Sequence, residues 1–235
     1  MTGKQLKIPI CQIDAFADKP FQGNPVAVCP LDNWLPDETL QSIAEENNLA
    51  ETVFFVEEEE GYRLRWFTPT KEVDLCGHAT LAAAHVLFEG ECRDRTEIAF
   101  ESKSGILRVL REEDSLTLDF SIQCGTRCDP PEGLIKGLGA EPIEYYRASD
   151  YLAVFGTSSE VAALTPDFRA LAKLDLRGVI VTGLGESEDF VGRFFSPKFG
   201  IDEDLVTGSA QCTLVPYWSE YLGKNVLTAT RVSKL

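Results

Sequence analysis

Two short motifs, about half a chain apart, place reactive or polar side chains on either side of a glycine. They are Cys76-Gly77-His78 and Thr207-Gly208-Ser209. An apolar run follows each motif, so each glycine is predicted to open a helix. The first turn of a helix presents unpaired backbone N–H groups and the positive end of the helix dipole, and both favour a bound anion. Two such helix starts facing each other would form a cleft for a small anionic molecule.

The segments upstream of these glycines also repeat. They read Arg65-Trp66-Phe67-Thr68-Pro69 and Arg193-Phe194-Phe195-Ser196-Pro197, and each is followed by a short acidic stretch. The order arginine, aromatic pair, hydroxyl, proline, acid, glycine is kept, with three extra residues before the second glycine. The chain is therefore predicted to contain two copies of one structural unit.

The elements that must position the first motif form a run of strands around one buried helix. Residues 7–16 and 24–29 are predicted to pair as antiparallel strands, and residues 37–48 to form a helix after Pro36. A hairpin is predicted from 52–56 and 62–67. The helix 79–88 is apolar nearly all round and ends at Gly90, which indicates burial. Three further strands are predicted at 97–100, 106–111 and 115–120.

The second half repeats this plan after a predicted linker at 124–133. Strands are expected at 151–155 and 178–182 with a helix at 168–174 between them, then at 190–195 and 227–232. The buried helix is expected at 209–222, with a kink or a late start because of Pro216. An α+β fold with domains 1–123 and 124–235 follows. A Rossmann fold is not predicted, because no βαβ alternation carries a glycine-rich nucleotide fingerprint.

Composition narrows the function classes. The net charge of −16 argues against nucleic acid as a partner. No segment approaches the roughly 20 apolar residues of a membrane helix, and no secretory signal is recognised, so a cytoplasmic protein is expected. The seven cysteines include no CxxC pair and are mostly expected as buried thiols. His78 and His85 are the only histidines and lie two helical turns apart, so no metal site is expected.

Several motifs in register resemble one family, the phenazine-biosynthesis PhzF-like (PhzC/PhzF) isomerases. They are Gln12-Ile13-Asp14-Ala15-Phe16, Gly23-Asn24-Pro25, Asn48-Leu49-Ala50-Glu51-Thr52, Phe67-Thr68-Pro69, Cys76-Gly77-His78-Ala79-Thr80 and Asp204-Leu205-Val206-Thr207-Gly208-Ser209-Ala210. The resemblance implies the diaminopimelate-epimerase-like fold: two similar domains, each a barrel-like, mainly antiparallel sheet around a central helix, with the active site between them. It also implies a homodimer, a small anionic metabolite as substrate, and no cofactor.

The resemblance assigns roles to individual positions. Glu51 matches the family's acid/base carboxylate, and His78 matches a histidine that helps to hold the substrate. Asp204 and Ser209 match the acidic and hydroxyl partners of the second domain. The backbone N–H groups at the two helix starts would come from two glycines, Gly77 and Gly208. The implied reaction moves a proton within a small unsaturated carboxylate, with one carboxylate acting as base and then as acid.

Two alternatives stay open. Related epimerases use two opposed cysteines; here Cys76 occupies the first of those positions, but Thr207 occupies the second. Cys76 is then either an inert core residue or a thiol activated by the helix start. The other alternative is a non-catalytic protein that binds an anionic metabolite. The family usually extends some tens of residues beyond the strand at 227–232, so a shortened second barrel is also expected.

Overall fold

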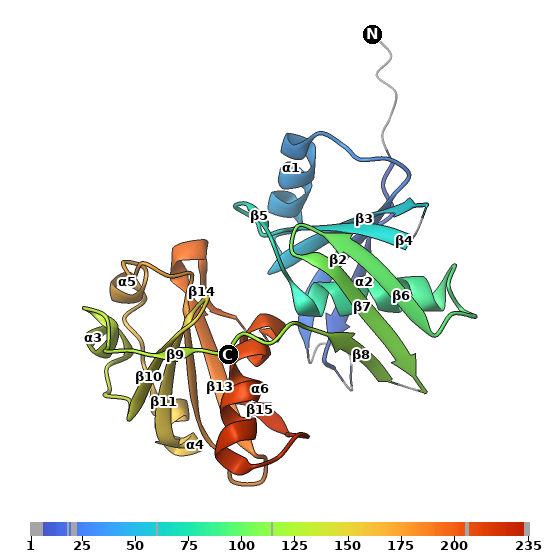
Figure 1. Ribbon diagram of the computed structural model, residues 1–235. Helices are drawn as coiled ribbons and strands as arrows, with labels where there is room; N and C mark the ends of the chain where they lie inside the picture. The colour runs from blue at the N-terminus through green and yellow to red at the C-terminus, as the bar shows by residue number, and fades with distance from the viewer. Residues whose placement is uncertain are drawn as a thin grey trace. The chain divides into compact units, whose positions relative to one another are not determined.

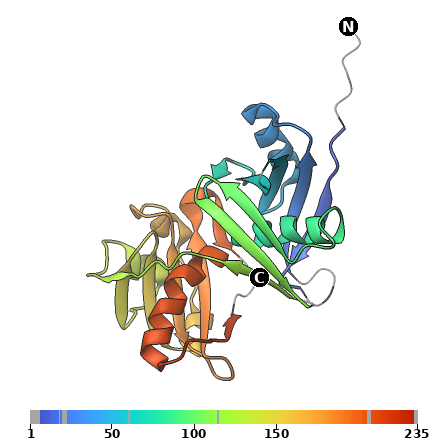
Figure 2. The same ribbon diagram turned by 45° about the vertical axis from the view of Figure 1, so that its right-hand side comes forward.

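The computed structural model describes residues 7–17, 19, 23–59, 61–113, 115–204 and 207–232. The chain forms two compact units, Met1–Phe120 and Ser121–Leu235, which we call unit 1 and unit 2. Figures 1 and 2 show each unit as helices packed on its own sheet, unit 1 from blue to green and unit 2 from yellow-green to red. Two residues of the predicted second motif, Leu205 and Val206, lie outside the described residues.

Unit 1 contains one sheet of eight strands. The strands are β1 (Cys11–Ala15), β2 (Asn24–Leu31), β3 (Glu51–Glu58), β4 (Gly61–Phe67), β5 (Glu72–Val73), β6 (Glu97–Ser102), β7 (Gly105–Glu112) and β8 (Ser115–Asp119). Their order in the sheet is β1-β2-β3-β4-β6-β7-β8, with β5 paired to β4. Two helices accompany the sheet, α1 (Asp37–Asn47) and α2 (Gly77–Glu89).

Helix α2 is the centre of unit 1. It packs against β1, β2 and β3 and also against β8, so the sheet curls until both of its edge strands reach the helix. The helix is apolar nearly all round, and its alanines, including Ala79 and Ala83, let the strands approach closely. The opposite face of the sheet carries α1, whose Leu40 and Ala44 pack against Phe54. Because side chains alternate along β3, Val53 faces α2 while Phe54 faces α1.

Unit 2 contains a sheet of seven strands. They are β9 (Thr126–Arg127), β10 (Glu144–Arg147), β11 (Tyr151–Thr157), β12 (Val179–Leu184), β13 (Phe190–Ser196), β14 (Ile201–Asp204) and β15 (Ala229–Arg231). Their order is β14-β13-β12-β11-β10-β9, with β15 paired to β13. The helices are α3 (Leu134–Leu138), α4 (Ser158–Ala163), α5 (Phe168–Leu171), the 3-10 turn η1 (Pro197–Phe199) and α6 (Gly208–Leu222).

The sheet of unit 2 is covered on both faces. Helix α6 packs on one face, where Trp218 meets Ile180 of β12 and stacks on Phe190 of β13 at 5.7 Å between ring centroids. Helices α3, α4 and α5 cover the other face, where residues such as Leu138 and Val181 form a separate core. Alternation along β12 again divides the strand between the two layers.

The connectivity of the two sheets confirms the predicted repeat. In unit 1, β2 runs parallel to β3, β3 is antiparallel to β4, β4 is antiparallel to β5, and β4 runs parallel to β6. In unit 2 the same four relations join β11, β12, β13, β14 and β15. The α+β class and the mainly antiparallel sheets are as expected. The parallel pairs were not expected; a crossover containing one or more helices produces each of them.

Two local expectations differ from the structure: the late start of the second buried helix, one of the two effects expected of Pro216, and the linker at 124–133. Helix α6 begins at Gly208 and continues through Pro216, so the helix does not start late. A proline lacks the N–H that would pair with the carbonyl four residues earlier. That carbonyl belongs to Cys212, and it accepts the backbone N–H of Gln123 at 2.9 Å. The predicted linker at 124–133 contains β9, because Thr126 and Arg127 pair with β10.

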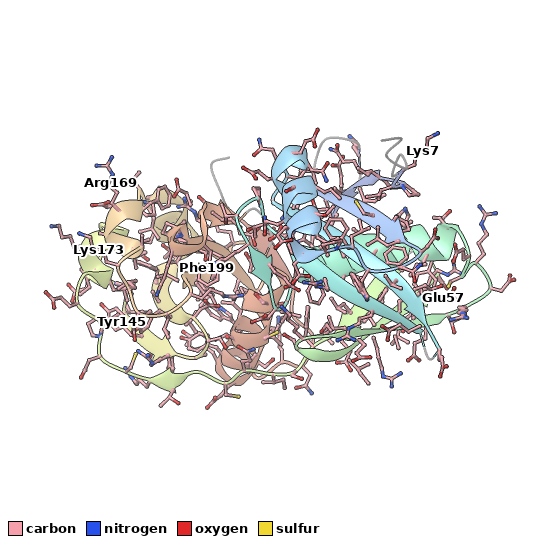
Figure 3. The ribbon with its side chains drawn as sticks, turned by 90° about the horizontal axis from the view of Figure 1, so that it is seen from above. Lys7, Glu57, Tyr145, Arg169, Lys173 and Phe199 are labelled. Carbon is pink, nitrogen blue, oxygen red and sulfur yellow. The ribbon has the colours of Figure 1, made fainter. Side chains whose placement is uncertain are left out.

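Charged side chains lie at the surface of both units. Lys7 and Glu57 of unit 1 and Arg169 and Lys173 of unit 2 are exposed and point away from the ribbon (Figure 3). Four of the seven cysteines are buried, while Cys11 and Cys124 are exposed. Within the described ranges, no helix combines the length and the apolar character needed to cross a membrane.

Candidate active site

Three of the predicted residues of unit 1 meet in one buried cluster. Glu51 is the first residue of β3, Cys76 is the N-cap of α2, and His78 lies in the first turn of that helix. The imidazole lies between the other two groups: Nε2 is 3.1 Å from Oε2 of Glu51, and Nδ1 is 3.5 Å from Sγ of Cys76. Glu51 is only 6% exposed and His78 only 2%. Residues from two segments, at Glu51 and at Cys76 to His78, thus form one acid–base group.

The local sequence explains how these side chains come together. Glu51 shares its face of β3 with Val53 and Phe55, and this face packs on α2. At the other side of the cluster, the first turn of α2 is held by Thr80. Both the hydroxyl and the backbone N–H of Thr80 donate to the carbonyl of Cys76, at 2.7 and 3.1 Å. The helix therefore begins at a fixed residue, and its first side chains reach the start of β3.

The Glu51–His78 contact is close but poorly aligned. At 3.1 Å the two atoms are within ion-pair distance, yet neither Oε2 nor Nε2 has a hydrogen-bond partner of good geometry among the described residues. Burial alone would lower the pKa of the imidazole, but the neighbouring Cys76 and Glu51 outweigh burial and raise the pKa of His78 well above its usual value. Burial, and then the Glu51 carboxylate, raise the pKa of the Cys76 thiol. Cys76 and Glu51, one at each imidazole nitrogen, thus both favour a charged His78.

The cluster also offers a set of metal-ligating atoms. One donor atom from each of Glu51, Cys76 and His78 lies within 4.8 Å of the others. However, the carboxylate and the thiol approach opposite nitrogens of the imidazole, and one metal ion takes only one of them. The contacts fit a chain of proton donors and acceptors better than a chelate. The expectation of no metal therefore stays a prediction.

The predicted residues of unit 2 form a second group at the start of α6. The hydroxyl of Thr207, the N-cap residue, donates to Oδ2 of Asp204 at 2.6 Å. Gly208 opens the helix, and the hydroxyl oxygen of the buried Ser209 accepts from Nη2 of Arg177 at 3.0 Å. The structure thus brings the four unit 1 residues together and the four unit 2 residues together.

Both helix starts keep their first N–H groups uncapped by the N-cap side chain. Cys76 precedes α2 and Thr207 precedes α6, and neither side chain accepts a hydrogen bond from its helix. Most helices satisfy these N–H groups with such a cap. The binding of an anion by the N–H groups of Gly77 and Gly208 stays a prediction.

Two functional candidates of unit 2 were missed from the sequence, namely Arg177 and Asp150. Nε of Arg177 donates to Oδ1 of the buried Asp150 at 2.9 Å, and Nη2 donates to Oδ2. The guanidinium also lies over the Phe194 ring, 5.2 Å from its centroid. One signal was present: Arg177 directly precedes a predicted strand, as Ala50-Glu51 does in the first copy.

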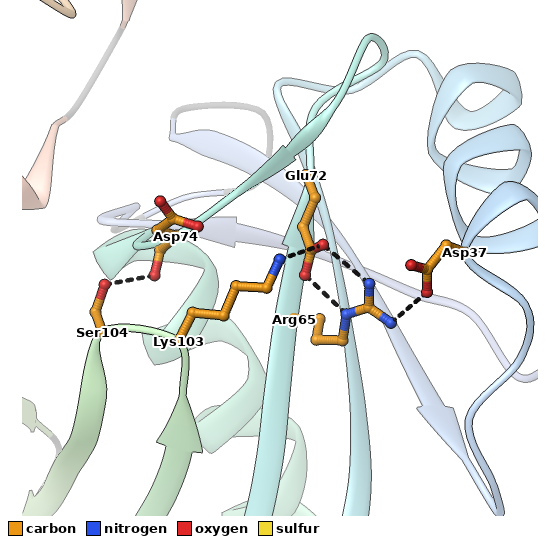
Figure 4. Close-up of polar contacts among 6 residues, drawn as sticks. All are labelled: Asp37, Arg65, Glu72, Asp74, Lys103 and Ser104. Atoms are coloured by element: carbon orange, nitrogen blue, oxygen red, sulfur yellow. Dashed lines mark hydrogen bonds and ion pairs between the residues drawn. The ribbon is translucent and has the colours of Figure 1, made fainter.

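The repeated arginines act away from both groups. Arg65 donates to both carboxylate oxygens of Glu72 through Nε and Nη2, at 2.7 and 2.9 Å (Figure 4). Arg193 makes the same two bonds to Glu203, at 2.9 and 2.8 Å. We call each pair an Arg–Glu fork. Each acidic stretch noted in the sequence thus supplies the partner of the repeated arginine, which makes the repeat structural at these positions.

Comparison with known proteins adds independent findings. The profile of the PhzC-PhzF family, described as phenazine biosynthesis-like protein, matches residues 13–130 and 133–234. An uncharacterized isomerase of Pseudomonas aeruginosa is 52% identical over 224 residues, which cover 95% of this chain and 86% of that protein.

Solved structures agree. The crystal structure of a phenazine biosynthesis PhzF family protein from Enterococcus faecalis has a TM-score of 0.91 and 46% identity, and the match covers 97% of this chain and 88% of that one. A probable proline racemase from Agrobacterium radiobacter has a TM-score of 0.65 at 10% identity, with coverage of 97% and 82%. The latter similarity extends to the fold alone.

Proposed function

This chain belongs to the PhzC-PhzF family of phenazine biosynthesis-like proteins and is an isomerase, and from this premise we propose that Glu51 moves a proton within a small unsaturated carboxylate. The observation that carries the proposal is the placement of the Glu51 carboxyl. It is buried, lies 3.1 Å from the imidazole of His78, and lacks a well-aligned hydrogen bond to any described residue. An oxygen that no well-aligned donor engages is open to receive a proton from a substrate carbon.

The reaction needs one base that later acts as an acid. The Glu51 carboxylate removes a proton from a carbon beside the substrate's carboxyl group, and the C–H electrons form a new double bond. The electrons of the original double bond then take the proton back from Glu51 at the far carbon. One C–H bond breaks and another forms, so atoms and charge balance without an oxidant or reductant. The product is the conjugated isomer.

His78 supports both halves of this cycle. Its raised pKa lets it hold a positive charge beside Glu51, which stabilises the carboxylate before proton removal. The imidazole stays within 3.1 Å of Oε2 and can donate to it again once the proton has returned to carbon. The uncapped N–H groups at the start of α2, in the same unit as Glu51, support the binding of the anionic substrate.

The two-base epimerase gains little support from the same residues. It would need a thiol at Cys76 that ionises near neutral pH, whereas burial raises the pKa of that thiol. Its partner position holds Thr207, whose hydroxyl donates to Asp204. If Cys76 were such a base, iodoacetamide would label it fast and abolish activity; we expect slow labelling of Cys76 and fast labelling of the exposed Cys11 and Cys124.

Deuterium exchange tests the proposal. The protein is incubated in deuterated water with vinylacetate and related small β,γ-unsaturated carboxylates, and proton NMR follows deuterium incorporation and the appearance of the conjugated isomer. Wild type should catalyse exchange, and Glu51→Gln should lower the rate by roughly 10²–10⁴-fold, the usual contribution of general acid–base catalysis. The matched control is Glu57→Gln, on the same strand but exposed, which should leave the rate unchanged. Full exchange by Glu51→Gln would sink the proposal.

A further inference from the structure

The repeat identifies the counterpart of Glu51 in unit 2. In the antiparallel pair β3–β4, Arg65 lies opposite Phe54; in β12–β13, Arg193 lies opposite Val181. Since the two arginines correspond, counting three positions back along each strand from these partners aligns Glu51 with Gly178. The corresponding helix starts align Cys76 with Thr207 and His78 with Ser209.

Gly178 leaves no room for a side chain. A Cβ placed there would lie 2.5 Å from the carbonyl oxygen of Phe195 and 2.7 Å from the ring of Phe194, both far inside van der Waals contact. Unit 2 therefore cannot carry a carboxylate at the position where unit 1 carries its base. The acid–base group of unit 1 therefore has no direct counterpart in unit 2.

Arg177, the residue before Gly178, contacts the helix start in unit 2, and its charge is opposite to that of Glu51. In unit 1 the side chain at the start of β3, Glu51, contacts His78 of α2. In unit 2 Arg177, just before β12, donates from Nη2 to Ser209 of α6 at 3.0 Å. Asp150, buried at 3% side-chain exposure, fixes the guanidinium through Nε and Nη2. Arg177 therefore has a fixed orientation before any ligand binds.

This contact decides how Ser209 can bond to a ligand. A hydroxyl has one hydrogen to donate and lone pairs to accept with. Because the Ser209 oxygen accepts from Arg177, its own hydrogen is available for another acceptor. Nη1 of Arg177 also has no hydrogen-bond partner within the described ranges, and about a third of the side chain, 30%, is exposed. The guanidinium charge beside the hydroxyl favours an anionic oxygen as that acceptor.

We propose that Arg177 is a positioning residue, which orients the Ser209 hydroxyl as the donor that recognises the substrate's carboxylate. The inference rests on the proposed function, because it takes an anionic substrate to be held by Ser209. Asp150 acts through Arg177 by fixing the guanidinium.

Binding of benzoate, compared with neutral benzamide, tests this role by calorimetric titration. Arg177→Gln should weaken benzoate binding about tenfold and leave benzamide unchanged, and Arg177→Lys should restore part of the affinity. Ser209→Ala should weaken benzoate to a similar degree. If Arg177 acts through Ser209, Arg177→Gln added to Ser209→Ala should have little further effect, since the two changes remove one shared interaction.

Controls separate recognition from folding. Arg147 of the same unit forms an exposed ion pair with Asp175, so Arg147→Gln should not change benzoate affinity. If Arg177→Gln unfolds because Asp150 is left buried and unpaired, the double variant Arg177→Gln/Asp150→Asn, which removes both charges, is titrated with benzoate and benzamide instead. Circular dichroism melting confirms that each variant is folded at the titration temperature.

Three outcomes would overturn the inference. They are equal benzoate affinity in wild type and Arg177→Gln, including no measurable binding by either; a parallel loss of benzamide binding; and an undiminished effect of Arg177→Gln in the Ser209→Ala background. None of these depends on Glu51. Failure of the proton-transfer proposal would instead appear as unchanged deuterium exchange in Glu51→Gln, so the two failures are distinguishable.

Discussion

Glu51 and Arg177 each contact the first turn of the long helix in their own copy of the repeat, and they carry opposite charges. In unit 1 a carboxylate, an imidazole and a protonated thiol meet at the start of α2. In unit 2 a guanidinium fixed by Asp150 meets a hydroxyl at the start of α6. The backbone plan of the repeat is preserved while the side chains differ. One scaffold thus carries a carboxylate–imidazole–thiol cluster in unit 1 and a guanidinium–hydroxyl pair in unit 2.

The Arg–Glu forks show the reverse pattern, because their chemistry is preserved while their surroundings differ. The fork of unit 1 is partly exposed, with 17% exposure for each side chain, and Asp37 and Lys103 add further ion pairs (Figure 4). The fork of unit 2 is buried, at 4% and 5% exposure for Arg193 and Glu203.

The largest expected difference concerns these forks. Arg193→Gln should lower the free energy of unfolding of unit 2 by about 3–5 kcal/mol, because it removes the two bonds of a buried arginine to Glu203 and its bonds to the carbonyls of Val161 and Leu164. Arg65→Gln should cost unit 1 about 1 kcal/mol, because its partners remain accessible to water. Urea denaturation of both variants measures the two values. Equal losses would contradict the distinction between a buried and an exposed fork.

A smaller loss of stability is expected at Gly178, the glycine that aligns with Glu51. Gly178→Ala should destabilise unit 2 by about 1–3 kcal/mol, because the added methyl overlaps the Phe195 carbonyl and the Phe194 ring. Gly192→Ala on neighbouring β13 is the control, since its Cβ would meet its nearest neighbour at an ordinary 3.5 Å. The midpoints of urea denaturation of the two variants measure this difference in stability. A neutral Gly178→Ala would mean that unit 2 does have room for a side chain where unit 1 has Glu51.

A third prediction concerns the charge of His78. Because its pKa is raised in the folded protein, NMR of labelled histidine should show the imidazolium persisting above pH 6.5, and Glu51→Gln should lower that pKa. A raised pKa stabilises the fold below the unfolded value, and this stabilisation is lost as pH rises through the folded value. In His85→Gln only one histidine is left, so the remaining imidazole resonance is that of His78. An unchanged His78 titration in Glu51→Gln would show that the two groups do not interact.

The smallest effect is expected in unit 2 at low pH. Hydrogen bonds from Tyr151 and then Arg147 lower the pKa of Asp175 to about 2. Since the unfolded carboxyl titrates near about 4, this group contributes stability above that pH and loses it as pH falls from about 4 to 2. In Asp175→Asn, the melting temperature of unit 2 should therefore fall less steeply between about pH 4 and pH 2 than in wild type. An identical acid limb in wild type and variant would count against the contribution.

The sequence by itself determined the α+β class, the repeat, most strands and the two buried helices. These features depend on local patterns: alternating apolar residues, a continuous apolar run between glycines, and one motif written twice. It also indicated which side chains belong to unit 1's cluster, although only the fold shows that Glu51 contacts His78.

What only the tertiary structure decided depends on contacts between distant residues. Arg177 meets Asp150 from 27 positions away and Ser209 from 32, and neither pairing leaves a periodic signal in the chain. Helix α6 continues through Pro216 because Gln123, far upstream, supplies the missing hydrogen bond to Cys212. Local propensity sets where an element can form. The partners that neutralise a buried charge or satisfy a freed carbonyl are chosen by packing, and so these residues emerged only with the fold.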